Sequence, residues 1–310
     1  MSQHLDPKQL DALLAVAEHA SFSKAAVALR LTLAAVSLRV SALEESLGQR
    51  LLVRGKRVSV TPSGSKLLAH VRHVRLMEAD LLSVLLGHGE TSAGRPMQTL
   101  SVAVNADSLA AWFLSGVSPT LKRHRLLLDI TIDDQDHTLE ALKQGQVVGC
   151  VTTSAQSIAG CAAIPLGVMR YRCVSSPMQR SKWLTPAGNV SLHRMLASPA
   201  VVFNRKDGLQ DMFLRQHFAL THAAYPRHFV PAVDAFEHAI VQGLGWGMVP
   251  ELMLGTRADA MGVVEVFDDK PVDVPLVWQH WVKESSAAKR LTQAVVGAAK
   301  QRLAANHLMS

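Results

Sequence analysis

The sequence of 310 residues has few cysteines, few aromatic residues and no long apolar run. Its three cysteines, Cys150, Cys161 and Cys173, are an odd number without a CxxC pair, which argues against a disulfide framework and against a metal site. No run approaches the roughly 20 apolar residues that cross a bilayer, and the first residues lack the basic and apolar regions of a secretory signal. We therefore expect a cytoplasmic protein with reduced thiols and no membrane partner.

Motifs of common enzyme classes are also missing. The sequence has no Gly-x-Ser-x-Gly elbow, and its 14 histidines include no HExxH motif. The stretch GLGWG at 243–247 follows a predicted helix and precedes a predicted strand, whereas a dinucleotide-binding loop needs the reverse order. His70 and His73 lie one turn apart and could hold a metal, but titratable side chains on a helix surface are the favoured interpretation. We expect neither an enzyme nor a cofactor.

Positive charge is concentrated in one part of the chain. The formal net charge is +7, and seven basic residues lie between Glu45 and Glu78 with no acidic residue among them. A basic surface of this kind can attract a polyanion such as nucleic acid, or it can be a solvated surface without a partner. Charge alone leaves both interpretations open. The seven residues are Arg50, Arg54, Lys56, Arg57, Lys66, Arg72 and Arg75.

Three short helices are predicted in the first fifty residues, because apolar residues recur there at the spacing of a helix with one buried face. A polar residue able to cap each helix precedes it, and a glycine ends the third. The last two helices meet at the short Arg30–Leu31 corner, which is typical of a helix-turn-helix. The predicted helices are 7–19 after Asp6, 22–29 after Ser21, and 33–47 between Thr32 and Gly48.

A basic hairpin and a long helix follow. Two β-prone runs, 51–54 and 57–60, flank a glycine-lysine tip, which predicts the wing of a winged helix-turn-helix with cations placed against phosphates. Thr61 and Pro62 then begin a long helix. Its apolar residues recur at spacings of three, four or seven, which favours pairing with a partner helix over an ordinary core helix. These residues are Leu67, Val71, Val74, Leu81 and Leu85, and Glu78 interrupts them.

Residues 5–90 resemble the N-terminal module of LysR-type transcriptional regulators. The matching pattern is FSKAAVAL, then T-x-x-AVS-x-R-V-x-x-LE-x-x-LG-x-x-LL-x-R, then VTPSG. The resemblance implies a homodimer or homotetramer that binds double-stranded DNA with recognition helices in successive major grooves and acts on RNA polymerase. The DNA-binding residues that it implies are Ser23, Thr32, Leu33, Ala34, Ser37, Leu38, Arg39, Arg54, Lys56 and Arg57.

Three of these positions are apolar where many relatives carry glutamine or serine. Leu33, Ala34 and Leu38 cannot hydrogen-bond to a base edge, although they can contact a thymine methyl group. We therefore expect that phosphate anchoring is retained and that direct readout is reduced or shifted toward DNA shape. Binding to DNA should weaken strongly as the salt concentration rises.

The last two hundred residues alternate short β-prone runs with helical stretches, after a small-residue linker at 87–96. The alternation predicts an α/β domain with largely parallel strands, in two lobes joined by two crossing strands, as in periplasmic binding proteins. The chain as a whole is thus expected to be α/β. The expected division is an all-α winged helix-turn-helix at 1–62, a linker and dimerisation helix with its hinge at 63–95, and an effector-binding domain at 96–305 with lobe one at 96–167 and 272–305 and lobe two at 168–271.

Polar residues stand at the strand-to-helix junctions, where a ligand between two such lobes is expected to bind. A helix N-terminus attracts a ligand carboxylate, and Asp107, Asp207 and Asp234 would be available for a ligand cation. Aspartate at a helix start also caps the helix without a ligand, so both interpretations stay open. The candidate effector-binding residues are Asn105, Ala106, Asp107, Ser108, Thr152, Thr153, Asn204, Asp207, Asp234 and Phe236.

A closer resemblance extends from residue 10 to about residue 302. SVAVNADSLAAWFL, VVG-x-V-T, PAVVFN-x-x-D, DAFEHAIVQG and MVP are similar to the arginine- and lysine-responsive, ArgP-type branch of the same family. This resemblance implies a basic amino acid as effector and control of amino acid export or biosynthesis genes. Pro231, Ala232 and Val233 stand where polar residues are usual, which leaves another small-molecule effector open. The other open interpretation is a solute-binding or nucleoid-associated protein without effector-coupled control of transcription.

Overall fold

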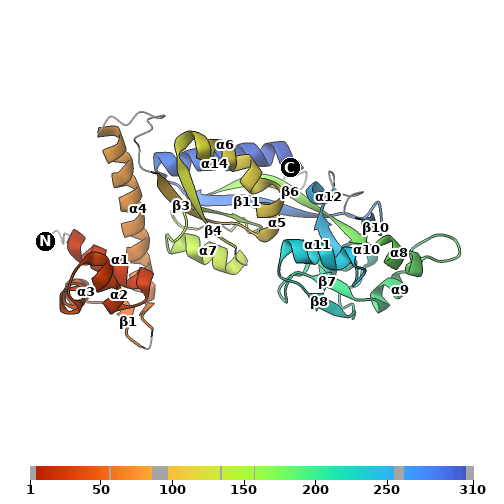
Figure 1. Cartoon of the computed structure of the whole chain (residues 1–310), viewed down its shortest axis with the longest axis horizontal. Coiled ribbons are helices and arrows are strands. Elements are labelled where there is room, and N and C mark those ends of the chain that lie inside the picture. Colours follow the sequence, from red (N-terminus) through yellow and green to blue (C-terminus); the bar gives the residue numbers. More distant parts are fainter. Residues whose placement is uncertain are drawn as a thin grey trace.

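The computed structural model describes residues 5–55, 57–85, 97–132, 135–156, 158–254 and 262–304. A small helical N-terminal part is followed by one long helix and by a larger α/β part built around one sheet (Figure 1). The predicted wing-tip Lys56 and the predicted linker 87–96 lie outside the described residues. No single described helix is long and apolar enough to cross a membrane, and only the bent pair Phe22–Leu29 and Leu33–Leu47 passes that test of length and composition together.

The three predicted N-terminal helices and their caps are confirmed. The two helices of the helix-turn-helix meet at 106°, and Leu13, Val36, Val40 and Leu43 are fully buried among the three helices. Each cap side chain accepts a hydrogen bond from a backbone N–H of the first turn, which satisfies a donor that the helix leaves free. The helices are α1 (Pro7–His19) capped by Asp6, α2 (Phe22–Leu29) capped by Ser21, and α3 (Leu33–Leu47) capped by Thr32 and ended by Gly48 at φ 63°.

The predicted wing is a hairpin of two short antiparallel strands, β1 (Leu52–Val53) and β2 (Ser59–Val60). A buried side chain of α3 holds it in place. Oε1 of Glu44 accepts hydrogen bonds from the backbone N–H groups of Leu51, at 2.7 Å, and Leu52, at 3.1 Å. Since both donors belong to buried residues, this contact fixes the wing relative to α3.

The long helix α4 (Pro62–Leu85) begins as predicted, with Oγ1 of Thr61 accepting from the backbone N–H of Gly64 at 3.1 Å. Its apolar positions have two different surroundings. Leu67 and Val71 pack into the N-terminal core, whereas Leu81 and Leu85 are 58% and 70% exposed. Only the second half of the predicted seam is therefore open to a partner helix.

A seven-stranded sheet forms the centre of the larger part, with strand order β10–β6–β11–β5–β3–β4 and β9 paired to β6. The two crossing strands are β6 and β11, which run between the two lobes in Figure 1. The expectation of largely parallel strands is wrong, because only the β3–β4 and β3–β5 pairs of this sheet are parallel. The crossing strands run in opposite directions and pair antiparallel with each other and with β5, β9 and β10. The strands are β3 (Gln98–Ala103), β4 (Leu126–Thr131), β5 (Gly149–Thr152), β6 (Cys161–Ser175), β9 (Gly247–Pro250), β10 (Val264–Glu265) and β11 (Val272–Trp281).

Helices of the first lobe cover the two faces of its strands, with α6 and α14 on one face and α7 on the other (Figure 1). The contact between α6 and α14 is close, since a Cβ added to Gly116 would lie 2.2 Å from the Cβ of Ala298. A π-helical turn, η1, leads into α6. The helices are α5 (Ala106–Ser108), η1 (Leu109–Phe113), α6 (Leu114–His124), α7 (Gln135–Lys143) and α14 (Ser286–Arg302).

The second lobe surrounds a small parallel sheet, β7 (Ala200–Val202) with β8 (Arg227–Phe229). Phe213 lies 6.4 Å from Trp246 and 6.0 Å from Phe267, between ring centroids, in its aromatic core. Gly243, at φ 75°, follows α11, so the GLGWG stretch ends a helix as predicted. The helices are α8 (Pro177–Trp183), α9 (Leu192–Ala197), α10 (Leu209–Phe218), α11 (Val233–Val241) and α12 (Glu251–Leu254).

Candidate functional site

The N-terminal half of α3 presents an exposed face that carries most of the predicted DNA-binding residues. Leu33 and Leu38 are 51% and 71% exposed, and Thr32 and Ala34 are exposed as well. The Thr32 hydroxyl already accepts a hydrogen bond from the backbone N–H of Ala35 at 3.1 Å. The other exposed side chains of this face, Leu33, Ala34 and Leu38, are apolar.

Arg54, which directly follows strand β1, connects the wing with α3. Its Nη2 donates to Oγ of Ser41 at 3.3 Å and to Oγ of Ser37 at 3.5 Å. Its guanidinium lies 4.8 Å from the centroid of the Phe22 ring, a cation–π contact. Two predicted DNA-binding residues, Ser37 and Arg54, are thus brought together. Of the remaining ones, Ser23 and Arg57 are exposed and Arg39 is half-buried.

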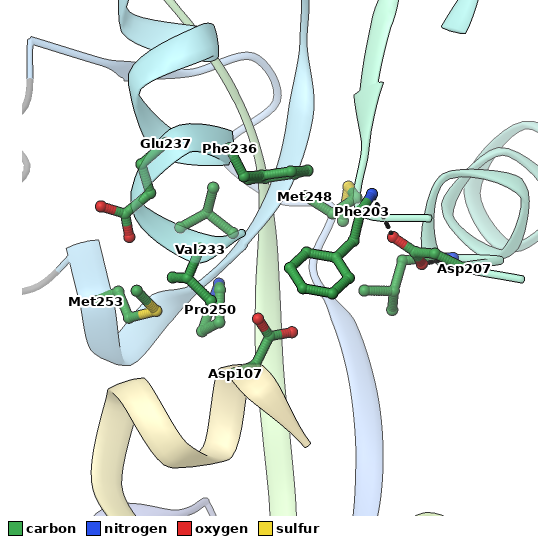
Figure 2. A pocket seen from close by; sticks show the side chains of 11 residues that line it. Asp107, Phe203, Asp207, Val233, Phe236, Glu237, Met248, Pro250 and Met253 are labelled. Atoms are coloured by element: carbon green, nitrogen blue, oxygen red, sulfur yellow. Dashed lines mark hydrogen bonds between the residues drawn. The ribbon is translucent and has the colours of Figure 1, made fainter. Parts of the chain in front are cut away.

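A pocket of about 340 Å³, including its open mouth, lies where α5 of the first lobe meets α11 and β9 of the second (Figure 2). Its wall combines apolar side chains with three carboxylates. Lysine and arginine do not occur among the described residues that line it. These residues are Asp107, Phe203, Asp207, Leu209, Val233, Phe236, Glu237, Met248, Val249, Pro250 and Met253.

Asp107 points into the pocket from the start of α5 (Figure 2). Asn105 fixes this helix start, because its Oδ1 accepts from the backbone N–H of Ser108 at 3.1 Å. Oδ2 of Asp107 accepts from the hydroxyl of Tyr171 at 2.7 Å. Burial raises the pKa of Asp107, the Tyr171 hydrogen bond lowers it, and the charge of Asp207 raises it further. A cation beside Asp107 would supply a counter-charge that favours its ionised form.

Asp207 also lines the pocket, but its carboxylate is engaged by the local backbone. Oδ2 accepts from the N–H of Phe203 at 3.1 Å and Oδ1 accepts from the N–H of Leu209 at 3.0 Å. Burial raises the pKa of Asp207, and these two backbone hydrogen bonds lower it. The capping interpretation therefore accounts for the orientation of Asp207, which adds negative charge to the pocket from a fixed position.

The structure brings some of the predicted effector-binding residues together and leaves others apart. Asp107, Asp207 and Phe236 line the pocket, and Asn105, Ala106 and Ser108 form the helix start that carries Asp107. Thr152, Thr153, Asn204 and Asp234 are not among its lining residues. Asp234 lies on the exposed side of α11. Thr152 is buried, and its Oγ1 accepts from the backbone N–H of Ser154 at 3.2 Å, within a local turn.

Glu237 is a lining residue that the sequence reasoning missed. Val233, Phe236 and Glu237 lie three and four positions apart, so they share one face of α11 and all line the pocket. Asp234 lies about 100° around the helix from Val233. The helical spacing of Val233 and Phe236 was the signal that could have pointed to Glu237.

Helix α11 begins beside the pocket without a side-chain cap. Ala232 stands at the N-cap position, and its side chain makes no capping hydrogen bond. The first turn of a helix has N–H groups without an intrahelical acceptor and carries a partial positive charge. The pocket thus offers carboxylates for a cation and a helix N-terminus for an anion.

Comparison with known proteins shows the family. Residues 7–65 match the bacterial regulatory helix-turn-helix protein, lysR family, and residues 93–300 match the LysR substrate binding domain. The chain is 38% identical over 296 residues to the HTH-type transcriptional regulator ArgP of Pseudomonas fluorescens, with 96% of this chain and 97% of that protein covered.

Two solved structures are similar to the whole chain. The crystal structure of ArgP from Mycobacterium tuberculosis has a TM-score of 0.85 at 38% identity, covering 98% of this chain and 100% of that one. Full-length LysG from Corynebacterium glutamicum with bound effector Arg has a TM-score of 0.77 at 33% identity, covering 97% of this chain and 100% of that one. The chain therefore belongs to the LysR family of bacterial transcriptional regulators.

Proposed function

We propose that this regulator binds double-stranded DNA through α3 and the wing, and that arginine or lysine in the pocket between the lobes controls its action. The observation that carries the effector proposal is the set of three carboxylates, Asp107, Asp207 and Glu237, in a pocket lined otherwise by apolar residues. The similar LysG structure, which has arginine bound as effector, supports the same ligand class. Genes for amino acid export or biosynthesis are the proposed targets.

Each part of a basic amino acid has a complementary surface in the pocket. The cationic head would lie against Asp107 and Glu237, where it offsets the cost of keeping carboxylates in a partly buried site. The aliphatic stem would pack on Val233 and Phe236. The α-carboxylate would accept from the uncapped first turn of α11. A neutral amino acid of the same length lacks the first of these interactions.

DNA binding is assigned to exposed cations and to the face of α3. Arg54 and Arg57 of the wing would contact phosphates, and Thr32, Ser37 and Arg39 would fix the position of α3 in the groove. Ser23, at the exposed start of α2, is a further candidate for a phosphate contact.

A second copy of the chain would cover the exposed end of α4, where Leu81, Leu82 and Leu85 are each more than half exposed. Pairing along this helix gives a dimer, and the dimer can assemble into a tetramer. The proposed division of labour follows the ranges 1–62, 63–95 and 96–305. Bound to chromosomal DNA in the cytoplasm, the assembly would act on RNA polymerase.

Contacts between α4 and the larger part offer a route for gating. Nη1 of Arg72 donates to the carbonyl oxygen of Gln144 at 3.2 Å, and the Asp80 carboxylate accepts from the backbone N–H of Ser286. An effector that favours one angle between the lobes can move α4 through these contacts. It shifts the equilibrium only by the difference in its affinity for the two states.

Transcription in a purified system tests the proposal. Genomic fragments that the full-length protein retains are placed upstream of a reporter sequence and transcribed by RNA polymerase, with and without arginine or lysine. We expect the transcript level to change only when the protein and a basic amino acid are both present. Transcription that ignores the protein and both amino acids would refute effector-coupled control.

A further inference from the structure

The exposed face of α3 has an unusual composition for a surface next to so many cations. Successive residues of an α-helix are rotated by about 100°, so Leu33 and Leu38 lie near the two edges of this face, with Ala34, Ser37 and Ser41 between them. Leu38 is 71% exposed and Leu33 is 51% exposed. Both leucines therefore lie on the surface rather than in the core that holds Val36 and Val40.

The polar groups of the same face are already engaged within the protein. Thr32 accepts the capping hydrogen bond from Ala35, and Ser37 and Ser41 accept from the Arg54 guanidinium. Leu33, Ala34 and Leu38 are the side chains of this face that carry no hydrogen-bonding group of their own. These three residues lie in the first two turns of α3, beside the serines that bind Arg54.

Charge identifies the occupant of this surface. Lys24, Arg30, Arg54 and Arg57 are exposed cations on α2, at its end, and in the wing. An apolar protein partner would cover such a surface at the cost of desolvating these charges. A DNA major groove matches it better, because phosphates at the groove edges pair with the cations while the groove floor meets the helix.

In the major groove, thymine is the base that presents an apolar group, its C5-methyl, to the protein. Thymine presents this methyl beside its O4 acceptor, whereas adenine, guanine and cytosine present hydrogen-bonding groups without a methyl, so a leucine gains a methyl contact only at thymine. We propose that Leu33, Ala34 and Leu38 read the operator through thymine methyl groups, so that each half-site is selected by methyl contacts in place of the hydrogen bonds that glutamine or serine would make. This inference rests on the proposed DNA binding by α3.

Replacing thymine by uracil in DNA tests the proposal, because it removes only the methyl group. Full-length protein first selects its preferred duplex from a random-sequence pool, and each thymidine of the selected half-sites is then replaced by deoxyuridine. We expect the dissociation constant to rise about fourfold for each contacted methyl, the effect of exposing one buried methylene-sized group. Deoxyuridine at thymidines outside the half-sites is the DNA control and should leave the constant unchanged.

Variants connect the effect to the leucines. In the Leu38→Gln and Leu33→Gln variants, the ratio of the dissociation constants for the uracil and thymine duplexes should fall to near one at the positions that each leucine contacts. Salt-dependent binding of these variants to any duplex should persist. The matched control is Leu244→Gln, which alters a leucine of the second lobe that is 49% exposed and should keep the full preference.

The inference would be overturned by deoxyuridine substitution without effect at every half-site thymidine, or by a thymine preference that survives in both α3 variants. A protein that binds all duplexes equally would overturn it as well. A protein that binds no duplex at low salt would refute the proposed DNA binding itself, so the two failures are distinguishable.

Discussion

Replacing Glu44 with alanine should remove the hydrogen bonds that hold the wing against helix α3. Oε1 of Glu44 is the acceptor for the backbone N–H groups of Leu51 and Leu52, and both residues are nearly inaccessible to water. A buried donor left without an acceptor costs about 1–3 kcal/mol, so losing both should destabilise the N-terminal part by about 2–6 kcal/mol. Glutamine keeps an acceptor oxygen and loses only the charge assistance, a cost of about 1 kcal/mol.

The distribution of tryptophan makes this measurement specific. All five tryptophans lie between residues 112 and 281, so tryptophan fluorescence reports the larger part of the chain while far-ultraviolet circular dichroism reports every helix. In urea, Glu44→Ala should shift a part of the dichroism transition to lower concentration and leave the fluorescence transition in place. The control is Glu45→Ala, an exposed neighbour on the same helix. If the two alanine variants unfold alike, the wing does not depend on Glu44 and the reasoning fails.

Further predictions concern the pocket, the contact between Gly145 and α4, and the basic surface. Asp107→Asn should weaken arginine binding by about 1.5–3 kcal/mol, the value of a charge-assisted hydrogen bond; calorimetry that finds equal affinity would leave Asp107 a structural role only. Because burial raises the pKa of Asp107, arginine binding to the unmodified protein should release protons, and the affinity should weaken as pH falls toward that pKa. Calorimetric titration in buffers of different ionisation enthalpy measures the proton release. The Asp107→Asn variant should lose this pH dependence. Without arginine, the free energy of unfolding should fall as pH rises through the raised pKa of Asp107, because the folded protein binds this proton more tightly than the unfolded chain does. Bound arginine should offset that loss of stability. Gly145→Ala should lower the melting temperature more than Gly188→Ala does. Both positions have positive φ, but a Cβ added at Gly145 would lie 2.6 Å from Cα of Ala69 in α4, whereas a Cβ added at Gly188 meets nothing within 4 Å. Equal melting temperatures of the two variants would contradict the contact between Gly145 and α4. The logarithm of DNA affinity should fall linearly with the logarithm of salt concentration, and Arg57→Ala should reduce that slope by about one unit; an unchanged slope would place Arg57 away from phosphate.

The N-terminal part could be predicted almost residue by residue, because its signals are local. Asp6, Ser21 and Thr32 cap the helices that directly follow them, and Gly48 ends a helix by its own backbone preference. Strand direction in the larger part depends on pairing between distant segments. Strands β6 and β11 pair across a separation of 103 residues at Arg170 and Asp273, and no local pattern records the direction of such a pair.

The candidate pocket was predicted in part for the same reason. Asp107 was found because it directly follows a strand and begins a helix, a position that local sequence indicates. Asp234 has the same local features, but it lies on the exposed side of α11, and Glu237 faces the pocket instead. Which side of a helix faces the other lobe depends on how the lobes pack, so a rule about helix starts could not choose between these two residues.

The central claim is that the pocket between the lobes takes a basic amino acid because of its carboxylates. Calorimetric titration of the full-length protein with arginine and lysine, and with the uncharged citrulline and norleucine of similar length, tests this directly. The account predicts saturable binding of arginine or lysine and at least tenfold weaker binding of its uncharged counterpart, as expected when about 1.4 kcal/mol or more of charge-assisted interaction is lost. Equal affinity for charged and uncharged ligands, or no binding of either basic amino acid, would contradict it.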